Sequence, residues 1–129
     1  MPVIEAVLDA SAILAVLRNE PGAEAVTAVL PRAAICTVNL AEVISTLINK
    51  GASAEQADMI VADVIAQRVS ADEQLARRAG SLRAATTQFG LSLGDRFCLA
   101  LAEREGVPAL TADQVWGKLE NGIVVTLIR

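Results

Sequence analysis

Five short apolar stretches, separated by segments of helical periodicity, constrain the fold of this chain more than any other feature. They are rich in Val, Ile, Leu and Ala, and they cover 3–8, 33–37, 68–71, 107–111 and 122–128. Consecutive parallel strands need a long connection, which is usually a helix, so this alternation predicts a parallel sheet covered on both faces. The expected fold class is α/β, a single-domain α/β/α sandwich with a central parallel sheet of about five strands over residues 1–129.

Helices are expected in the intervals between these strands. Their ranges are 11–19, 22–30, 39–49, 54–67, 72–89, 94–105 and 112–119. Gly51 is placed to end the helix over 39–49, whose apolar side chains form one stripe. A chain of 129 residues can bury a core of this kind without a metal or a disulfide.

The two cysteines and the apolar runs bear on the cellular compartment. Cys36 and Cys98 stand in apolar stretches without the spacing of metal ligands, and both are expected to be buried free thiols. The chain has no run of about 18 apolar residues, and its start, "MPVIEAV", lacks the basic flank and cleavage site of a signal peptide. We therefore expect a cytoplasmic protein.

Missing residue types narrow the chemistry. The chain has no His and no Tyr, which excludes a Ser-His-Asp or Cys-His nucleophile, a zinc site built on imidazole, and acid–base catalysis by paired histidines. Its 11 basic and 15 acidic residues give a net charge of −4, which argues against nucleic-acid binding by bulk electrostatics. If the chain is an enzyme, carboxylates must carry the reaction.

Four acids stand where a strand gives way to a helix. They are Asp9, Glu42, Asp95 and Asp113. In open parallel sheets, sites form at the carboxyl ends of the strands, so these four side chains are expected to gather at one edge.

Helix capping is the alternative explanation for some of these acids. Ser92 with Asp95, and Asn39 with Glu42, have capping-box spacing, and an acid in a first turn is favoured by the helix dipole without any function. Four acids together are harder to explain in this way, because a helix needs only one capping residue.

Asp9 is the least readily explained as a cap. A carboxylate that ends a nearly apolar strand is costly to bury unless it is capped or paired. Ser11 is close enough to compete for the N-cap position, which would leave Asp9 free for another role.

Converging carboxylates without Lys or His are typical of a Mg²⁺ or Mn²⁺ site. Such an ion binds phosphate and activates water, which points to phosphodiester hydrolysis. Without these four acids the chain has 11 acidic residues against 11 basic ones, and a local positive cluster is expected at Arg77, Arg78 and Arg83.

Four segments, "VLDASAILAVL", "TVNLAEVISTL", "LSLGDRFCLALA" and "LTADQVW", resemble in order and spacing the PIN domain family, specifically the VapC-type ribonuclease toxins of VapBC toxin-antitoxin modules. The resemblance implies an endoribonuclease that needs Mg²⁺ or Mn²⁺ and hydrolyses RNA with a metal-activated water. It also implies the catalytic and metal-binding residues Asp9, Glu42, Asp95 and Asp113, with Ser11 and Thr111 as accessory hydroxyls that orient carboxylates or water.

The resemblance further implies a homodimer and a cognate VapB-type antitoxin. The helices at 11–19, 23–30 and 39–49 carry more aliphatic surface than a small sandwich can bury, which predicts an exposed apolar groove. An amphipathic partner helix would fit such a groove, and dimerisation through the same helices would also cover it. Trp116 is expected to be a packing anchor rather than a base-stacking platform.

Two other classes of function remain open from the residues. A phosphoacceptor signalling domain is also α/β with acids at strand ends, but it needs a lysine near the final strand, and neither Lys50 nor Lys118 follows one. The other class is a catalytically idle binding module on the same scaffold. Replacing Asp9 would distinguish such a module from an enzyme.

Overall fold

A parallel sheet forms the middle layer of the protein. The structure is a computed structural model that describes residues 3–129. The five strands, in the order β3-β2-β1-β4-β5, are paired parallel throughout. Their bounds are β1 Ala6–Leu8, β2 Ala33–Cys36, β3 Gln67–Val69, β4 Ala109–Thr111 and β5 Val125–Leu127. The predicted α/β class is confirmed.

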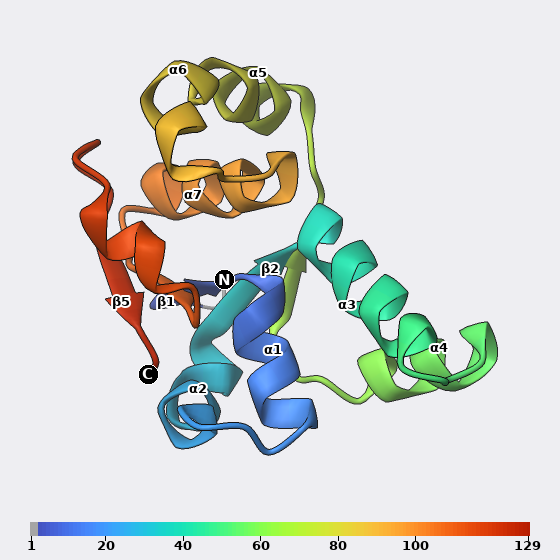
Figure 1. The fold of residues 1–129 in the computed structure, drawn as a ribbon. Coiled ribbons are helices and arrows are strands. Elements are labelled where there is room, and N and C mark those ends of the chain that lie inside the picture. The colour runs from blue at the N-terminus through green and yellow to red at the C-terminus, as the bar shows by residue number, and fades with distance from the viewer. Residues whose placement is uncertain (1–2) are drawn as a thin grey trace.

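Helices cover both faces of this sheet, as Figure 1 shows. The helices α5, α6 and α7 lie on one side, and α1 to α4 lie on the other. Their bounds are α1 Ala10–Leu17, α2 Ala23–Val29, α3 Thr37–Asn49, α4 Ala54–Ala62, α5 Glu73–Ser81, α6 Arg83–Thr86 and α7 Leu93–Glu105. Short 3₁₀ turns are η1 Leu30–Arg32, η2 Thr87–Phe89 and η3 Gln114–Lys118.

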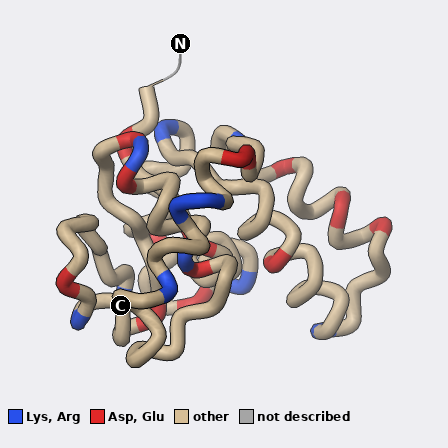
Figure 2. The backbone as a smooth tube through the Cα atoms, turned by 90° about the horizontal axis from the view of Figure 1, so that it is seen from above, with Lys and Arg blue, Asp and Glu red and all other residues tan. Residues whose placement is uncertain are grey.

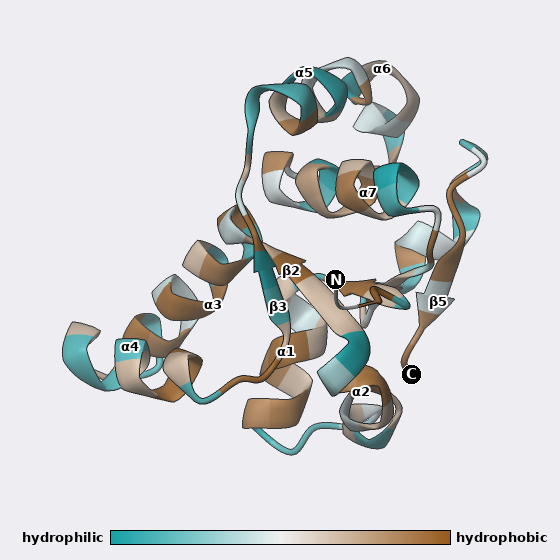
Figure 3. Cartoon of the chain, turned by 180° about the vertical axis from the view of Figure 1, so that it is seen from behind, coloured by the Kyte–Doolittle hydropathy of each residue, from teal (hydrophilic) through white to brown (hydrophobic). Residues whose placement is uncertain are grey.

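The core consists of two apolar layers separated by the sheet. Successive side chains of β1 point to opposite faces, so Ala6 and Leu8 pack with α1 to α4, whereas Val7 packs with α5 and α7. Apolar segments of α1, α3 and β2 are brown in Figure 3, and the edge strand β3 is largely teal. Trp116 is buried in the second layer, as predicted for a packing anchor.

Three predicted helices differ in the structure. The stretch 54–67 is helical only to Ala62, because Gln67–Val69 pairs with β2 as a strand. The stretch 72–89 divides into α5, α6 and η2, where the hydroxyl of Thr86 bonds to the Leu82 carbonyl, a contact that bends helices. The stretch 112–119 is the 3₁₀ turn η3 rather than an α-helix.

The positive cluster predicted at Arg77, Arg78 and Arg83 is largely neutralised. Arg77 pairs with Glu73, and Arg78 forms two hydrogen bonds to Glu103 on α7. Figure 2 shows basic and acidic positions intermingled along the backbone. The cluster therefore contributes little net positive charge.

Two further expectations concern the cysteines and the membrane. Cys36 and Cys98 are free and buried, as expected. Among residues 3–129, no helix combines the length and the apolar character that crossing a bilayer would require.

Candidate active site

Asp9 lies at the carboxyl end of the central strand, and its carboxylate is almost fully enclosed. It is the N-cap of α1: Oδ1 accepts hydrogen bonds from the Ala12 amide at 2.8 Å and the Ser11 hydroxyl at 2.7 Å. Oδ2 accepts one from the Thr111 hydroxyl at 2.5 Å. The expectation that Ser11 competes with Asp9 for the cap is wrong, because Ser11 donates to the capping carboxylate.

The two hydroxyl residues also tie the β1 and β4 ends together. The Ser11 hydroxyl accepts a hydrogen bond from the Ala112 amide at 2.9 Å, and the Thr111 hydroxyl accepts one from the Asp113 amide at 3.0 Å. Each side chain therefore donates to Asp9 and accepts from the segment after β4. Asp9 and the backbone of Asp113 are thus linked through one hydrogen-bond network.

Glu42 reaches the site from α3 and is held by a neighbour on the same helix. Its Oε1 accepts a hydrogen bond of 2.8 Å from Asn39 Nδ2, which also donates to the Gly94 carbonyl at 3.0 Å. The capping box suggested by the Asn39–Glu42 spacing is not formed, since α3 begins at Thr37 with no side-chain cap.

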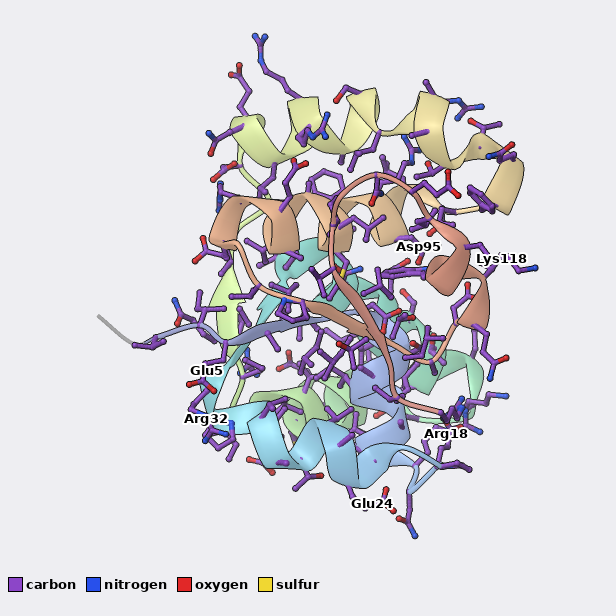
Figure 4. The ribbon with its side chains drawn as sticks, turned by 90° about the vertical axis from the view of Figure 1, so that its left-hand side faces the viewer. Glu5, Arg18, Glu24, Arg32, Asp95 and Lys118 are labelled. Carbon is purple, nitrogen blue, oxygen red and sulfur yellow. The ribbon has the colours of Figure 1, made fainter. Side chains whose placement is uncertain are left out.

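Asp95 and Asp113 each sit at the start of a helical segment. Asp95 and Ser92 form the predicted capping box of α7, with Asp95 Oδ2 accepting from the Ser92 amide at 2.9 Å. Asp113 is the N-cap of η3 and accepts from the Val115 amide at 3.1 Å. In Figure 4, Asp95 lies on the side of the molecule opposite Glu5 and Arg32, which precede β1 and β2.

The electrostatics show that the predicted acids lie within range of one another. Burial, opposed by the hydrogen bonds from Ser11, Thr111 and Ala12 and aided slightly by the charge of Asp95, raises the pKa of Asp9 from 3.8 to about 6. Burial, and then Asp95, raises the pKa of Glu42. Burial chiefly raises the pKa of Asp95 as well, with Asp113 adding to it. The fold thus brings like charges to one edge of the sheet.

Carboxylate oxygens are suitable ligands for a hard cation, but the four side chains do not converge on a single point. Within residues 3–129, no three carboxylates are placed to hold one ion with the side chains as they lie. One oxygen in each of three acids accepts no hydrogen bond from the described side chains or amides, namely Glu42 Oε2, Asp95 Oδ1 and Asp113 Oδ2. Glu42 and Asp95 are partly buried and Asp113 is exposed, and carboxylates that repel one another, with oxygens to spare, fit Mg²⁺ or Mn²⁺.

Sequence reasoning missed Gly94 and Arg96 at this site and considered Asn39 only as a capping residue. Asn39 and Gly94 contact Glu42, and Arg96 is buried beside Asp95 with one bond of 3.0 Å to the Ala79 carbonyl. Only the Asn39–Glu42 spacing indicated a contact between two of these side chains, and a capping box explained that spacing as well as a lateral hydrogen bond did. The contacts of Gly94 and Arg96 join segments that are far apart in sequence.

Comparison with known proteins gives a consistent result. The family model described as the PIN domain matches residues 6–121. The comparison with curated protein sequences gave no match.

Solved structures share the whole fold at low identity. DNA-bound VapBC from Salmonella typhimurium matches with a TM-score of 0.78 and 20% identity, covering 98% of this chain and 100% of that one. A toxin-antitoxin complex from Klebsiella pneumoniae matches at 0.72 and 20%, covering 97% and 98%. The Mycobacterium tuberculosis toxin VapC20, described as cleaving the sarcin-ricin loop, matches at 0.71 and 17%, covering 93% and 97%.

Proposed function

The chain belongs to the PIN domain family, and on that premise we propose that it is a Mg²⁺- or Mn²⁺-dependent endoribonuclease, the toxin of a type II toxin-antitoxin module. The observation that carries the proposal is the buried Asp9 carboxylate at the end of the central strand, with its pKa raised to about 6 beside Asp95. A structural neighbour described as an RNA-cleaving toxin supports RNA as the substrate.

The roles of the individual residues follow from their contacts. Asp9, Glu42, Asp95 and Asp113 would hold the metal, and a bound Mg²⁺ or Mn²⁺ lowers the pKa of water and neutralises charge on the phosphate. Ser11 and Thr111 fix both oxygens of Asp9 by donating to them. Arg96 donates to a carbonyl on α5, so it belongs to the packing of α7.

The ends of the RNA products test the reaction class. Attack by water on phosphorus does not use the 2′-hydroxyl as nucleophile, so cleavage should leave a 5′-phosphate and a 3′-hydroxyl. Mass spectrometry of the fragments of a synthetic RNA distinguishes these ends. A 2′,3′-cyclic phosphate would contradict the proposed chemistry, and full activity in excess EDTA would contradict the metal dependence.

A polar cleft between η2 and η3 is a candidate route for the RNA strand. It has a volume of about 290 Å³ and is lined by Ala85, Gln88, Phe89, Lys118 and Glu120. Its walls are η2, which leads into the α7 segment with Asp95, and η3, which begins after Asp113. Lys118 extends outward from η3 in Figure 4 and forms no ion pair with the described carboxylates. We propose that it contacts the RNA backbone next to the acids.

Replacing Lys118 with Ala should weaken RNA binding by about 2- to 5-fold, as expected for one exposed ionic contact. The substitution should also reduce the slope of log Kd against log salt concentration by about 0.7. Fluorescence anisotropy of a labelled single-stranded RNA on the Asp9→Asn protein measures both without cleavage. Lys50→Ala is the matched control, because Lys50 is also exposed and without an ion pair among described residues, but lies at the far end of α3. Equal losses in the two variants would remove Lys118 from the RNA path.

Exposed apolar side chains support a protein partner. Ile48 on α3, with Met59 and Ile60 on α4, are 41%, 64% and 38% exposed. Two neighbours are described as a VapBC and a toxin-antitoxin complex, so we propose that a cognate VapB-type antitoxin covers these residues. A second copy of this chain is the alternative occupant of this surface. Light scattering of the isolated chain shows whether it dimerises without an antitoxin.

A further inference from the structure

The Glu42 carboxylate lies directly against the backbone of Gly94. A Cβ atom built on Gly94 would stand 2.3 Å from Glu42 Oε2 and 2.6 Å from Oε1, far inside van der Waals contact. Gly94 is not among the glycines with positive φ, so its backbone conformation does not require glycine. Glycine also disfavours a helix relative to Ala. The space taken by Glu42 is therefore the physical reason for glycine here.

Asn39 joins the same carboxylate to the same residue. Its side chain is fully buried, and Nδ2 donates to both Glu42 Oε1 and the Gly94 carbonyl. A buried amide is costly unless it is hydrogen-bonded, so these two bonds set its orientation. Its Oδ1 has no partner among the described residues. The amide thus holds α3 and the first turn of α7 at a defined separation.

We propose that Gly94 and Asn39 are positioning residues that fix the Glu42 carboxylate over the first turn of α7. Asp95 is the next residue after Gly94, so the same contact sets the acid of α3 relative to the acid of α7. The inference rests on the proposed function in taking both acids as metal ligands. Ligands held in place before the ion arrives bind it more tightly than ligands that must be ordered.

Gly94→Ala tests the proposal with little risk to the fold. The atoms that a new methyl group would meet belong to the end of a flexible side chain, so Glu42 can swing away without movement of the backbone. We expect Mn²⁺ affinity, measured by isothermal titration calorimetry, to fall about 10- to 100-fold, as for lost supporting contacts at metal sites. The melting temperature should stay level or fall slightly, because the Asn39 hydrogen bond that Glu42 gives up offsets the gain that Ala brings to the helix.

Gly80→Ala is the matched control. Gly80 is also helical, in α5, but has no atom within 4 Å of a built Cβ. It should show a small gain in stability, because Ala favours the helix and no contact is lost, and no change in Mn²⁺ affinity. Unchanged affinity in Gly94→Ala would overturn the proposal.

A double-mutant cycle asks whether Glu42 carries the effect. In a Glu42→Ala background, Gly94→Ala should cost no further Mn²⁺ affinity, because the carboxylate that it displaces is absent. The same loss in both backgrounds would mean that Gly94→Ala acts through the backbone of α7, and would overturn the role assigned to Glu42.

A third measurement needs no metal. In ¹H–¹⁵N spectra of the metal-free protein, the Asn39 side-chain amide resonances should move in Gly94→Ala and in Glu42→Ala, and stay in place in Gly80→Ala. If they do not move in the first two variants, the contact does not exist and the inference fails. If they move but the wild-type protein binds no Mn²⁺, the contact stands and the proposed function fails instead.

Discussion

Asp9→Asn is expected to lose RNA cleavage by more than about 100-fold while remaining folded. Loss of a supporting contact at a metal site typically costs 10- to about 100-fold, and Asp9 is proposed as a direct ligand. An amide oxygen can still accept from the Ala12 amide and the Ser11 hydroxyl, so the N-cap of α1 is retained. Cleavage of a labelled RNA in Mn²⁺, followed on a gel, measures the loss.

Stability separates this effect from simple unfolding. A carboxyl whose pKa is raised from 3.8 to about 6 by burial costs the folded protein on the order of 3 kcal/mol at pH 7. A neutral amide removes that cost, so Asp9→Asn should melt at or above the wild-type temperature. Asp58→Asn, at an exposed position of α4, serves as the control and should change neither property. Full cleavage by Asp9→Asn would contradict the role of Asp9 as a metal ligand, and absence of cleavage by the wild-type protein would favour a catalytically idle binding module.

Acidifying the metal-free protein from pH 7 to pH 5 should increase its free energy of unfolding. The folded state binds a proton at Asp9 more tightly than the unfolded state does. The stabilisation from this group is therefore fully present below pH 3.8 and is lost as the pH rises through about 6. Between pH 7 and pH 5 the gain is about 1 kcal/mol. Raised pKa values at Glu42 and Asp95 act in the same direction.

Divalent metal should reverse this preference for low pH. At about 100 times its Kd, Mn²⁺ adds about 2.7 kcal/mol to the free energy of unfolding at pH 7. For a chain of this size the melting temperature then rises by roughly 10 °C. The rise should shrink below about pH 6, where protons compete for Asp9. Thermal unfolding across this pH range, with Mn²⁺ and with EDTA, measures both effects.

Asp9→Asn supplies the control for the metal and pH experiments. This variant should show neither the increase in free energy of unfolding at low pH that is assigned to Asp9 nor the full rise in melting temperature with Mn²⁺. The pKa of Asp72 is lowered by the Leu75 amide and then by Arg104, and that of Glu103 by Arg78. Both groups act in the opposite direction below pH 5, so the comparison stops there. A wild-type melting temperature that does not respond to Mn²⁺ at pH 7 would contradict the metal site.

Local signals in the sequence were enough to predict the strands and the acids at their ends. Short β-branched or aliphatic stretches mark the strands, although β3 is largely hydrophilic, and a parallel sheet places their carboxyl ends at one edge, which is why Asp9, Glu42 and Asp113 could be selected. The alternation of strands and helices gave the order of the elements. Their ends were less certain, because the composition of 72–89 is helical throughout and only the Thr86 contact reveals a bend.

Contacts between distant segments could not be predicted in this way. Asn39 and Glu42 have the same spacing whether they form a capping box or a lateral bond, and only the position of Gly94 on α7 decides between them. The partner of Arg78 is Glu103, which lies 25 positions further along the chain, so the apparent positive cluster could not be discounted from sequence. Tertiary packing, which no local pattern encodes, determines these features.

The strand order has a consequence for how such proteins can diverge. Three of the four acids follow β1, β2 and β4, the inner strands, and Asp95 begins α7, whereas none of the four lies in or directly after the edge strands β3 and β5. Natural variation in loop length or side chains can therefore accumulate at both margins of the sheet while the reaction chemistry is preserved. Relatives should differ most at these margins, which makes them suitable places to graft tags or reporter sequences.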